Sequence, residues 1–199
     1  MIGRFQYMTR ITNPEEIEIA IRDDREFVQC LAEEDGFIRL ALFPMGDMLY
    51  LYCECEGTPS PDKLLPRIGD CVDGWRFMDN VYYTCIPASM EQWSRKGEKE
   101  ACCRIGRLLP DKVASYIKYH IMYMEEGIRK GDKYQYISLL DNTLFIYYES
   151  PVEETCLRPD RTGESMVQKE WIKQDPVGHF DHSFSGEANF VDIKAVIAV

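Results

Sequence analysis

The chain has 199 residues, of which 45% are hydrophobic, enough to bury a core in one large domain or two small ones. With 34 acidic and 23 basic residues, its formal net charge is −11, which repels phosphate backbones and anionic lipid surfaces. No stretch reaches the run of about eighteen apolar residues that spans a bilayer. We therefore expect a cytoplasmic protein with no nucleic-acid and no membrane partner, whose eight cysteines are reduced thiols.

The first half predicts a strand, a helix, a hairpin, a second helix and a last strand. Pro14 followed by Glu15 and Glu16 is typical of a helix start, because carboxylates favour the positive end of the helix dipole. Gly46 and Asp47 predict the hairpin turn. The expected elements are a strand over 4–11, a helix over 14–34, strands over 38–42 and 48–53, a helix from 62 toward 78, and a strand over 80–86.

The second half repeats this order. We expect a strand over 101–108, a helix over 110–129, a hairpin over 134–150, a helix over 163–173 and a last strand over 189–199. Residues 92–100 are charged and poor in apolar side chains, as in a linker. The predicted domains are therefore a half over 1–91, a linker over 92–100 and a half over 101–199.

An internal repeat supports this division. The segment 42–54, which ends in Tyr52-Cys53-Glu54, returns as the segment 139–149, which ends in Tyr147-Tyr148-Glu149. The predicted fold class is α+β, with two tandem ferredoxin-like βαββαβ units. Such a sheet carries helices on one face only, so we expect the two sheets to pack against each other as an intrachain pseudo-dimeric α/β barrel.

One histidine falls on a predicted helix. Tyr116 and His120 are four residues apart and therefore face the same way, with Tyr123 along the same edge of an apolar stripe. Imidazole changes its charge near neutral pH, so a Tyr–His pair at the margin of a core could act as an acid/base pair. Alternatively, His120 could hydrogen-bond at the edge of a core.

Aromatic side chains offer a binding surface. Tyr134 and Tyr136 alternate onto one face of a predicted strand, and Trp171 lies on the following helix. These side chains could line a pocket near His120 that stacks on sugar rings, or they could simply fill the core between the sheets.

The remaining candidates are weaker. His179 and His182 lie close together in a glycine-flanked loop, without the further ligands that a metal site needs. The cysteine pairs lack the spacing of zinc or redox motifs, and no phosphate-binding loop or nucleophile elbow is present. We therefore expect no metal and no cofactor.

The second half resembles the L-rhamnose mutarotase family. The resemblance rests on Tyr116-x-x-x-His120 in a helix, Tyr136 in a strand, the hairpin 144–149 and Trp171 in the next helix. It spans about residues 102–199, and 13–78 more faintly. Members of that family are ferredoxin-like subunits that pair into dimeric α/β barrels and interconvert the anomers of a deoxy sugar.

The chain departs from that family in several positions. Where the family has Arg-His and a tryptophan four residues on, this chain has Tyr119-His120 and Met124, and Glu170 stands where the family has the first of two tryptophans. In the first half, Ala20 and Asp24 align with the Tyr and His positions. We therefore expect the first half to lack the site.

The resemblance implies a mutarotase-like enzyme that acts on a small sugar. His120 would be the acid/base, Tyr116 and Tyr136 its relay partners, and Trp171 the stacking platform, with Tyr134 and Tyr123 as further substrate-binding residues. The alternative is a non-catalytic module that binds a small ligand or a partner, and a third option is a barrel oxygenase or haem-linked enzyme. The pseudo-dimer is expected to remain a monomer or to form a further homodimer.

Overall fold

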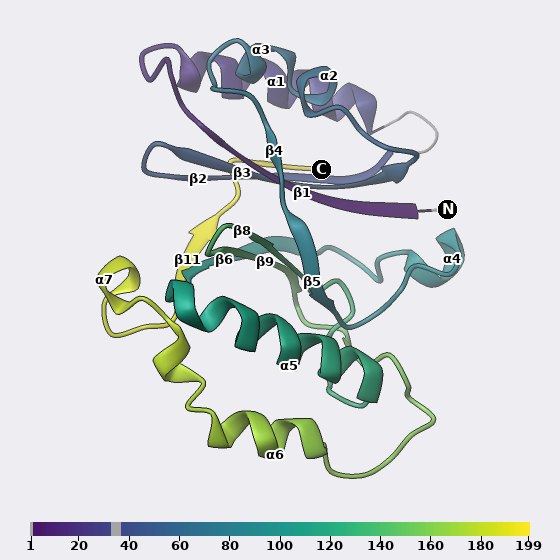
Figure 1. Ribbon diagram of the computed structural model, residues 1–199. Coiled ribbons are helices and arrows are strands. Elements are labelled where there is room, and N and C mark those ends of the chain that lie inside the picture. Colours follow the sequence, from purple (N-terminus) through teal and green to yellow (C-terminus); the bar gives the residue numbers. More distant parts are fainter. Residues whose placement is uncertain (1, 33–36) are drawn as a thin grey trace. The chain divides into compact units, whose positions relative to one another are not determined.

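The computed structural model describes residues 2–32 and 37–199, so the predicted end of the first helix at residue 34 lies outside the described residues (Figure 1). The chain forms two compact units. Unit 1 consists of Met1–Met78, Pro87–Gly97 and Ile193–Val199, and unit 2 of Asp79–Ile86 and Glu98–Asp192. The chain therefore leaves unit 1 after Met78 and returns to it at Pro87. It leaves unit 1 a second time after Gly97 and returns at Ile193.

Unit 1 is built on a five-stranded sheet with the order β12-β2-β3-β1-β4. All of its strand pairs are antiparallel, and Gly46 makes the β2–β3 turn with a φ of +60°, which glycine adopts without strain. Helices cover one face of this sheet (Figure 1). The elements are β1 (Ile2–Arg10), α1 (Ile17–Leu31), β2 (Phe37–Met45), β3 (Met48–Glu56), α2 (Pro61–Leu64), α3 (Pro66–Gly69), β4 (Arg76–Phe77), α4 (Met90–Trp93) and β12 (Ile197–Ala198).

Strand alternation divides the residues of β3 between the two faces of the sheet. Leu49, Leu51 and Cys53 belong to the apolar core that the sheet shares with Val28 of α1. Tyr50, Tyr52 and Glu54 lie between them in sequence and therefore point to the opposite face. They are almost completely buried as well, so both faces of this strand are covered.

The predicted helix from residue 62 toward 78 is wrong. The structure instead has the two short helices α2 and α3, followed by the strand β4. Pro66 disfavours the helical conformation at the preceding residue, and Leu65 accordingly has φ −135° and ψ 66°. Gly74, with a φ of +77°, then precedes the strand.

Unit 2 repeats the arrangement with the strand order β11-β6-β9-β8-β5. Helix α5 lies along this sheet and contacts α6 (Figure 1). Its elements are β5 (Asp79–Tyr83), β6 (Glu100–Arg107), η1 (Pro110–Lys112), α5 (Val113–Glu126), β7 (Gly131–Asp132), β8 (Tyr136–Leu140), β9 (Thr143–Ser150), β10 (Glu154–Thr155), α6 (Met166–Lys173), η2 (Val177–His179), α7 (His182–Ser185) and β11 (Val191–Lys194).

The last strand of each repeat is divided between the sheets. In the first repeat, β4 pairs with β1 of its own sheet, whereas β5 pairs with β8 in the sheet of unit 2. In the second repeat, β11 lies beside β6, whereas β12 pairs with β2 in the sheet of unit 1. Each sheet thus has the ferredoxin-like order of four strands plus one strand supplied by the other repeat.

The prediction of an α+β fold with two ferredoxin-like units is confirmed. The packing of the two sheets into a barrel, and the domain limits at residues 91, 92–100 and 101, stay predictions. Of the described helices, none combines the length and the apolar composition needed to cross a membrane.

Candidate functional site

His120 is buried in the core of unit 2, on α5. Its Nδ1 lies 2.9 Å from the backbone carbonyl oxygen of Tyr116, and a carbonyl only accepts, so Nδ1 carries the proton. Burial, with a smaller effect from Arg129, lowers the pKa of His120 to about 4, against the opposing effect of that hydrogen bond. At neutral pH the side chain is therefore an uncharged imidazole whose Nε2 is an acceptor.

Aromatic rings surround this imidazole. Tyr116 stacks on it with ring centres 3.9 Å apart, and Tyr82, Tyr123 and Trp171 present edge-on contacts at 5.5, 6.0 and 6.1 Å. The α-helical spacing of α5 brings Tyr116, His120 and Tyr123 to one side, and Trp171 approaches from α6. The structure thus brings together four of the six predicted site residues.

Tyr136 and Tyr134 are not part of this cluster. Tyr136 is paired in register with Tyr147, and its neighbour Ile137 is the residue that faces the α5 core. Tyr136 therefore lies on the opposite face of the sheet from His120. Tyr134 precedes β8, is fully buried and lies beside the ammonium group of Lys133. His120 and Trp171 therefore lie together on one side of the sheet, and Tyr136 lies apart from them on the other.

The other two histidines, His179 at the end of η2 and His182 at the start of α7, make hydrogen bonds within the protein. His179 contacts the Asp175 carbonyl oxygen through Nδ1 at 2.9 Å and the Ser115 hydroxyl through Nε2 at 3.1 Å. His182 contacts two backbone carbonyl oxygens. Within residues 2–32 and 37–199, no group of three or more His, Cys, Asp or Glu side chains is placed to hold a metal ion.

In unit 1, Asp24 stands where the repeat predicts the counterpart of His120, and its role is structural. Its carboxylate is fully buried and accepts hydrogen bonds from the backbone N–H groups of Arg67 at 3.1 Å and Ile68 at 2.7 Å. These groups belong to the first turn of α3 and have no partner within the helix. Asp24 therefore fixes α3 against α1.

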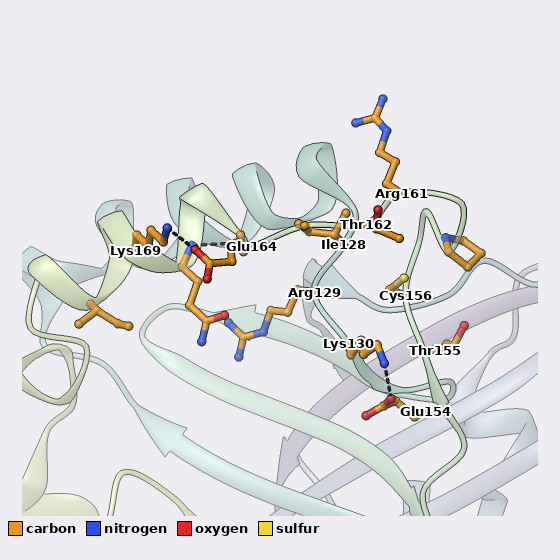
Figure 2. A pocket seen from close by; sticks show the side chains of 15 residues that line it. Ile128, Arg129, Lys130, Glu154, Thr155, Cys156, Arg161, Thr162, Glu164 and Lys169 are labelled. Carbon is orange, nitrogen blue, oxygen red and sulfur yellow. Dashed lines mark hydrogen bonds and ion pairs between the residues drawn. The ribbon is translucent and has the colours of Figure 1, made fainter.

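Unit 2 has an open groove of about 1070 Å³, which we call the α6 groove (Figure 2). It is formed by residues 128–130 after α5, by residues 154–156, 159 and 161–165, and by one side of α6. None of the six predicted site residues lines it. The sequence gives no signal for this groove, because most of its lining residues lie in loops, which carry no periodic pattern.

The charges of the α6 groove are only partly paired. Lys130 contacts Glu154 at 2.9 Å, and Lys169 contacts Glu164. The other two lining cations, Arg129 and Arg161, make no ion pair with any residue in the described part of the chain. Figure 2 shows Arg129 among the lining side chains and Arg161 extending away from them.

Arg129 connects the α6 groove with the aromatic cluster. Its guanidinium carbon lies 4.4 Å from the ring centre of Tyr123, which contacts His120. The start of α6, in contrast, is already occupied by an anion, because the Glu126 carboxylate accepts from the Met166 N–H at 2.7 Å. An anionic group that enters the groove would therefore meet Arg129 rather than the helix terminus.

A second polar cluster, which we call the Glu54 network, is buried in unit 1. The Glu54 carboxylate accepts from Arg95 at 2.9 and 3.0 Å, from the Trp93 indole N–H at 2.8 Å and from the Tyr52 hydroxyl. Tyr52 also accepts from Arg4 Nε at 2.9 Å. Burial raises the pKa of Glu54, but Arg95, Arg4 and Tyr52 outweigh it, so the pKa is lowered and the carboxylate is ionised.

The repeat contained the signal for the Glu54 network. In unit 2, the Tyr147 hydroxyl donates to Glu149 at 2.6 Å, and both residues are fully buried, as are Tyr52 and Glu54. A tyrosine two residues before a glutamate in both copies indicates a shared hydrogen bond across one strand face. From the sequence alone, this pattern indicates only the hairpin.

Comparisons with known proteins identify no family. No protein-family model matches the sequence, and a search of curated proteins finds no match. A solved structure from Lactobacillus acidophilus, described as a "putative monooxygenase", is 10% identical with a TM-score of 0.43, covering 98% of each chain. A second "putative monooxygenase", from Fusobacterium nucleatum, is 11% identical with a TM-score of 0.44, covering 99% of this chain and 93% of that one. An "anthrone oxidase-like protein" is 10% identical with a TM-score of 0.40, covering 100% and 96%.

These matches do not agree with the resemblance to the L-rhamnose mutarotase family, on which the predicted sugar substrate rested. The solved structures that match nearly the whole chain are described as monooxygenases or as anthrone oxidase-like, not as mutarotases. The assignment to the L-rhamnose mutarotase family is therefore wrong. Similarities this distant assign no activity to the chain.

Proposed function

We propose that this protein binds a small organic anion in the α6 groove of unit 2. The observation that carries the proposal is the guanidinium group of Arg129, which lines the groove without a carboxylate partner among the described residues, with the similarly unpaired Arg161 at the rim. A guanidinium is also suited to a carboxylate or phosphate, since its N–H groups match their planar geometry.

The apolar walls of the α6 groove define the rest of the ligand. Ile128, Ile172 and Pro159 line it together with the cations, so the anionic group should be attached to an apolar body. Arg129 is the principal contact and Arg161 a contact at the rim.

Binding is a better conclusion from this geometry than acid/base catalysis. His120 is uncharged at neutral pH and uses Nδ1 for the Tyr116 carbonyl, and Tyr136 lies on the other face of the sheet. A general base works best with a pKa near the working pH, and about 4 is too low. The aromatic cluster therefore supports the back of the groove through Tyr123 and Arg129.

Isothermal titration calorimetry with benzoate tests the proposal, with benzyl alcohol as the uncharged probe of similar shape. We expect wild-type protein to bind benzoate more tightly than benzyl alcohol. Arg129→Gln should weaken benzoate binding at least tenfold, because a hydrogen bond to a charged group contributes about 1.5–3 kcal/mol. Lys118→Gln is the matched control, since it removes one charge from the exposed side of α5, outside the groove.

Two results would contradict the proposal. One is equal affinity of wild type for benzoate and benzyl alcohol. The other is equal loss of benzoate affinity in Arg129→Gln and Lys118→Gln, which would show that only the net charge of the protein matters.

A further inference from the structure

The outer face of α5 carries apolar side chains that are open to solvent. Because successive residues of a helix are about 100° apart, this face points away from the side on which Tyr116, His120 and Tyr123 are buried. It forms an open groove of about 540 Å³, with Ile121, which is 43% exposed, at its centre. We call this face the α5 stripe, and its residues are Ala114, Ile117, Lys118, Ile121, Met122 and Glu125.

The α5 stripe has the spacing of a helix–helix contact. Ala114, Lys118, Ile121 and Glu125 follow one another at intervals of four, three and four residues. This is the spacing of the seam along which two helices pack, whereas a surface helix needs apolar side chains only on its inner side. The two charges of the stripe are exposed, and neither makes an ion pair with any residue in 2–32 or 37–199.

The first repeat provides an internal comparison. The counterpart of His120 in α1 is Asp24. The two residues that follow Asp24 are Arg25 and Glu26, which are charged and exposed, as is usual for the outer side of a helix. In α5 the same two positions are Ile121 and Met122 of the stripe. The fold therefore does not require apolar side chains here, and their presence in α5 needs another reason.

We propose that the α5 stripe is the interface of a homodimer, in which α5 packs antiparallel against α5 of a second copy of this chain. A two-fold axis between Ile121 and Met122 places Lys118 opposite Glu125 of the second copy. The same axis places Glu125 opposite Lys118 of the second copy, so both charges that are unpaired in one chain find partners. Such pairs fix the register of two surfaces, and the apolar side chains between them are covered. Symmetry supplies this match from the chain itself, which favours a second copy over an unrelated partner.

Sedimentation equilibrium measures this dimer, at about 0.15 M salt, where the repulsion between copies of net charge −11 is screened. One helix face makes a small interface, so we expect a monomer–dimer equilibrium in which the dimer is populated at about 1 mM protein. Ile121→Asp buries an unpaired charge in the interface and should weaken the dimer at least tenfold. Ile19→Asp is the matched control and should not weaken it, because Ile19 is 52% exposed on α1, outside the stripe.

A charge exchange tests the antiparallel register. Lys118→Glu and Glu125→Lys each bring like charges together across the axis, and each should weaken the dimer at least tenfold. The double variant carries the same two charges in exchanged positions and should dimerise within about threefold of wild type. The two single variants, mixed at equal concentration, should form a heterodimer, because one stripe is then acidic and the other basic.

Circular dichroism checks that each variant is folded, which is expected because all three side chains are exposed. A wild-type protein that is still monomeric at about 1 mM would overturn the inference. So would equal dimer affinities of Ile121→Asp and Ile19→Asp, or single charge variants that do not associate when mixed. The α5 stripe and the α6 groove share no lining residue, so the loss of either proposal leaves the other standing.

Discussion

At the residue scale, Glu54 shows how a buried charge is tolerated in this fold. Moving a carboxylate out of water is strongly unfavourable. A buried carboxylate stays ionised only when a partner charge and hydrogen bonds replace the solvent. Arg95 supplies two of these bonds and the opposite charge, and its own side chain is only 15% exposed. The interaction is therefore little screened by water, unlike the exposed pair of Arg10 and Asp47.

Removing Arg95 should be far more damaging than removing a surface arginine. Arg95→Met leaves Glu54 buried without its counter-charge, and we expect the free energy of unfolding at pH 7 to fall by about 3–5 kcal/mol. Arg10→Met, which breaks the exposed pair, should change it by less than about 1 kcal/mol. Chemical denaturation followed by circular dichroism measures both.

The pH dependence of this effect has a definite sign. The folded-state pKa of Glu54 is lowered, so its contribution is present above the unfolded-state pKa and is lost as the pH falls through the folded-state pKa. The difference between wild type and Arg95→Met should therefore shrink as the pH falls, first because burial raises the pKa of Glu54 in the variant and it takes up a proton there, and then because Glu54 of the wild type is protonated as the pH falls through its lowered pKa. A difference that stays constant from pH 7 to pH 3 would contradict an ionised Glu54.

The sequence correctly predicted which side a side chain faces when the residue lies on a helix, but not when it lies on a strand. The four-residue spacing of Tyr116 and His120 correctly placed both on one side of α5. Tyr136 was misplaced because alternation shows which residues share a face, but not which face meets the helix. The side-chain amide of Gln6 is buried without a hydrogen-bond partner among the described residues, and the sequence does not show this, since it depends on what the neighbours already bind.

At the element scale, helices and hairpins followed from local chemistry. The starts of α1 and α5 follow the prolines Pro14 and Pro110, the first hairpin turns at Gly46, and the second hairpin lies within the predicted range 134–150. The helix expected from residue 62 failed because a proline inside the segment outweighed its apolar spacing. The division of each repeat's last strand was not predicted, since a strand pattern does not reveal which sheet it joins.

Strand β12 should protect the edge of the unit 1 sheet from solvent exchange. The Leu40 N–H donates to the Val199 carbonyl oxygen at 3.2 Å, and the Val199 N–H donates back at 3.0 Å. Ile197 is 1% exposed and belongs to the unit 1 core. Deleting residues 196–199 should therefore speed hydrogen exchange at the Leu40 amide at least tenfold, as measured by NMR.

Amides between β1 and β3 serve as the control, because their partners remain in the truncated chain. If the Leu40 amide exchanges at the same rate in both proteins, β12 does not stabilise this edge. If the β1–β3 amides accelerate equally, the deletion has destabilised the whole unit rather than its edge strand.

At the scale of the whole molecule, the two repeats form two sheets, and each sheet contains one strand from the other repeat. Unit 1 needs β12 from the end of the chain, and unit 2 needs β5 from the first repeat. Sequence periodicity finds the two repeats but not this exchange, because strand pairing over such distances leaves no local pattern. The fold of each repeat is thus specified locally, and its completion depends on the other.

Separating the repeats should leave two incomplete sheets. A fragment of residues 1–97 lacks β12 and carries β5 without its partner β8. A fragment of residues 98–199 lacks β5 and carries β12 without its partner β2. Exposed edge strands associate readily, so each fragment alone should aggregate or melt without a cooperative transition. Mixed at equal concentration, the two should form a one-to-one complex, because each supplies the strand that the other lacks.

Size-exclusion chromatography with light scattering, together with thermal melts, distinguishes the outcomes. The exchange of strands requires that the mixture gives a single species with the mass of the intact chain and a cooperative melt. It also requires that removing residues 79–83 from the first fragment weakens this complex, because β5 then no longer completes the sheet of unit 2. Two fragments that are each monomeric, melt cooperatively and ignore one another would show instead that each repeat folds as an independent domain.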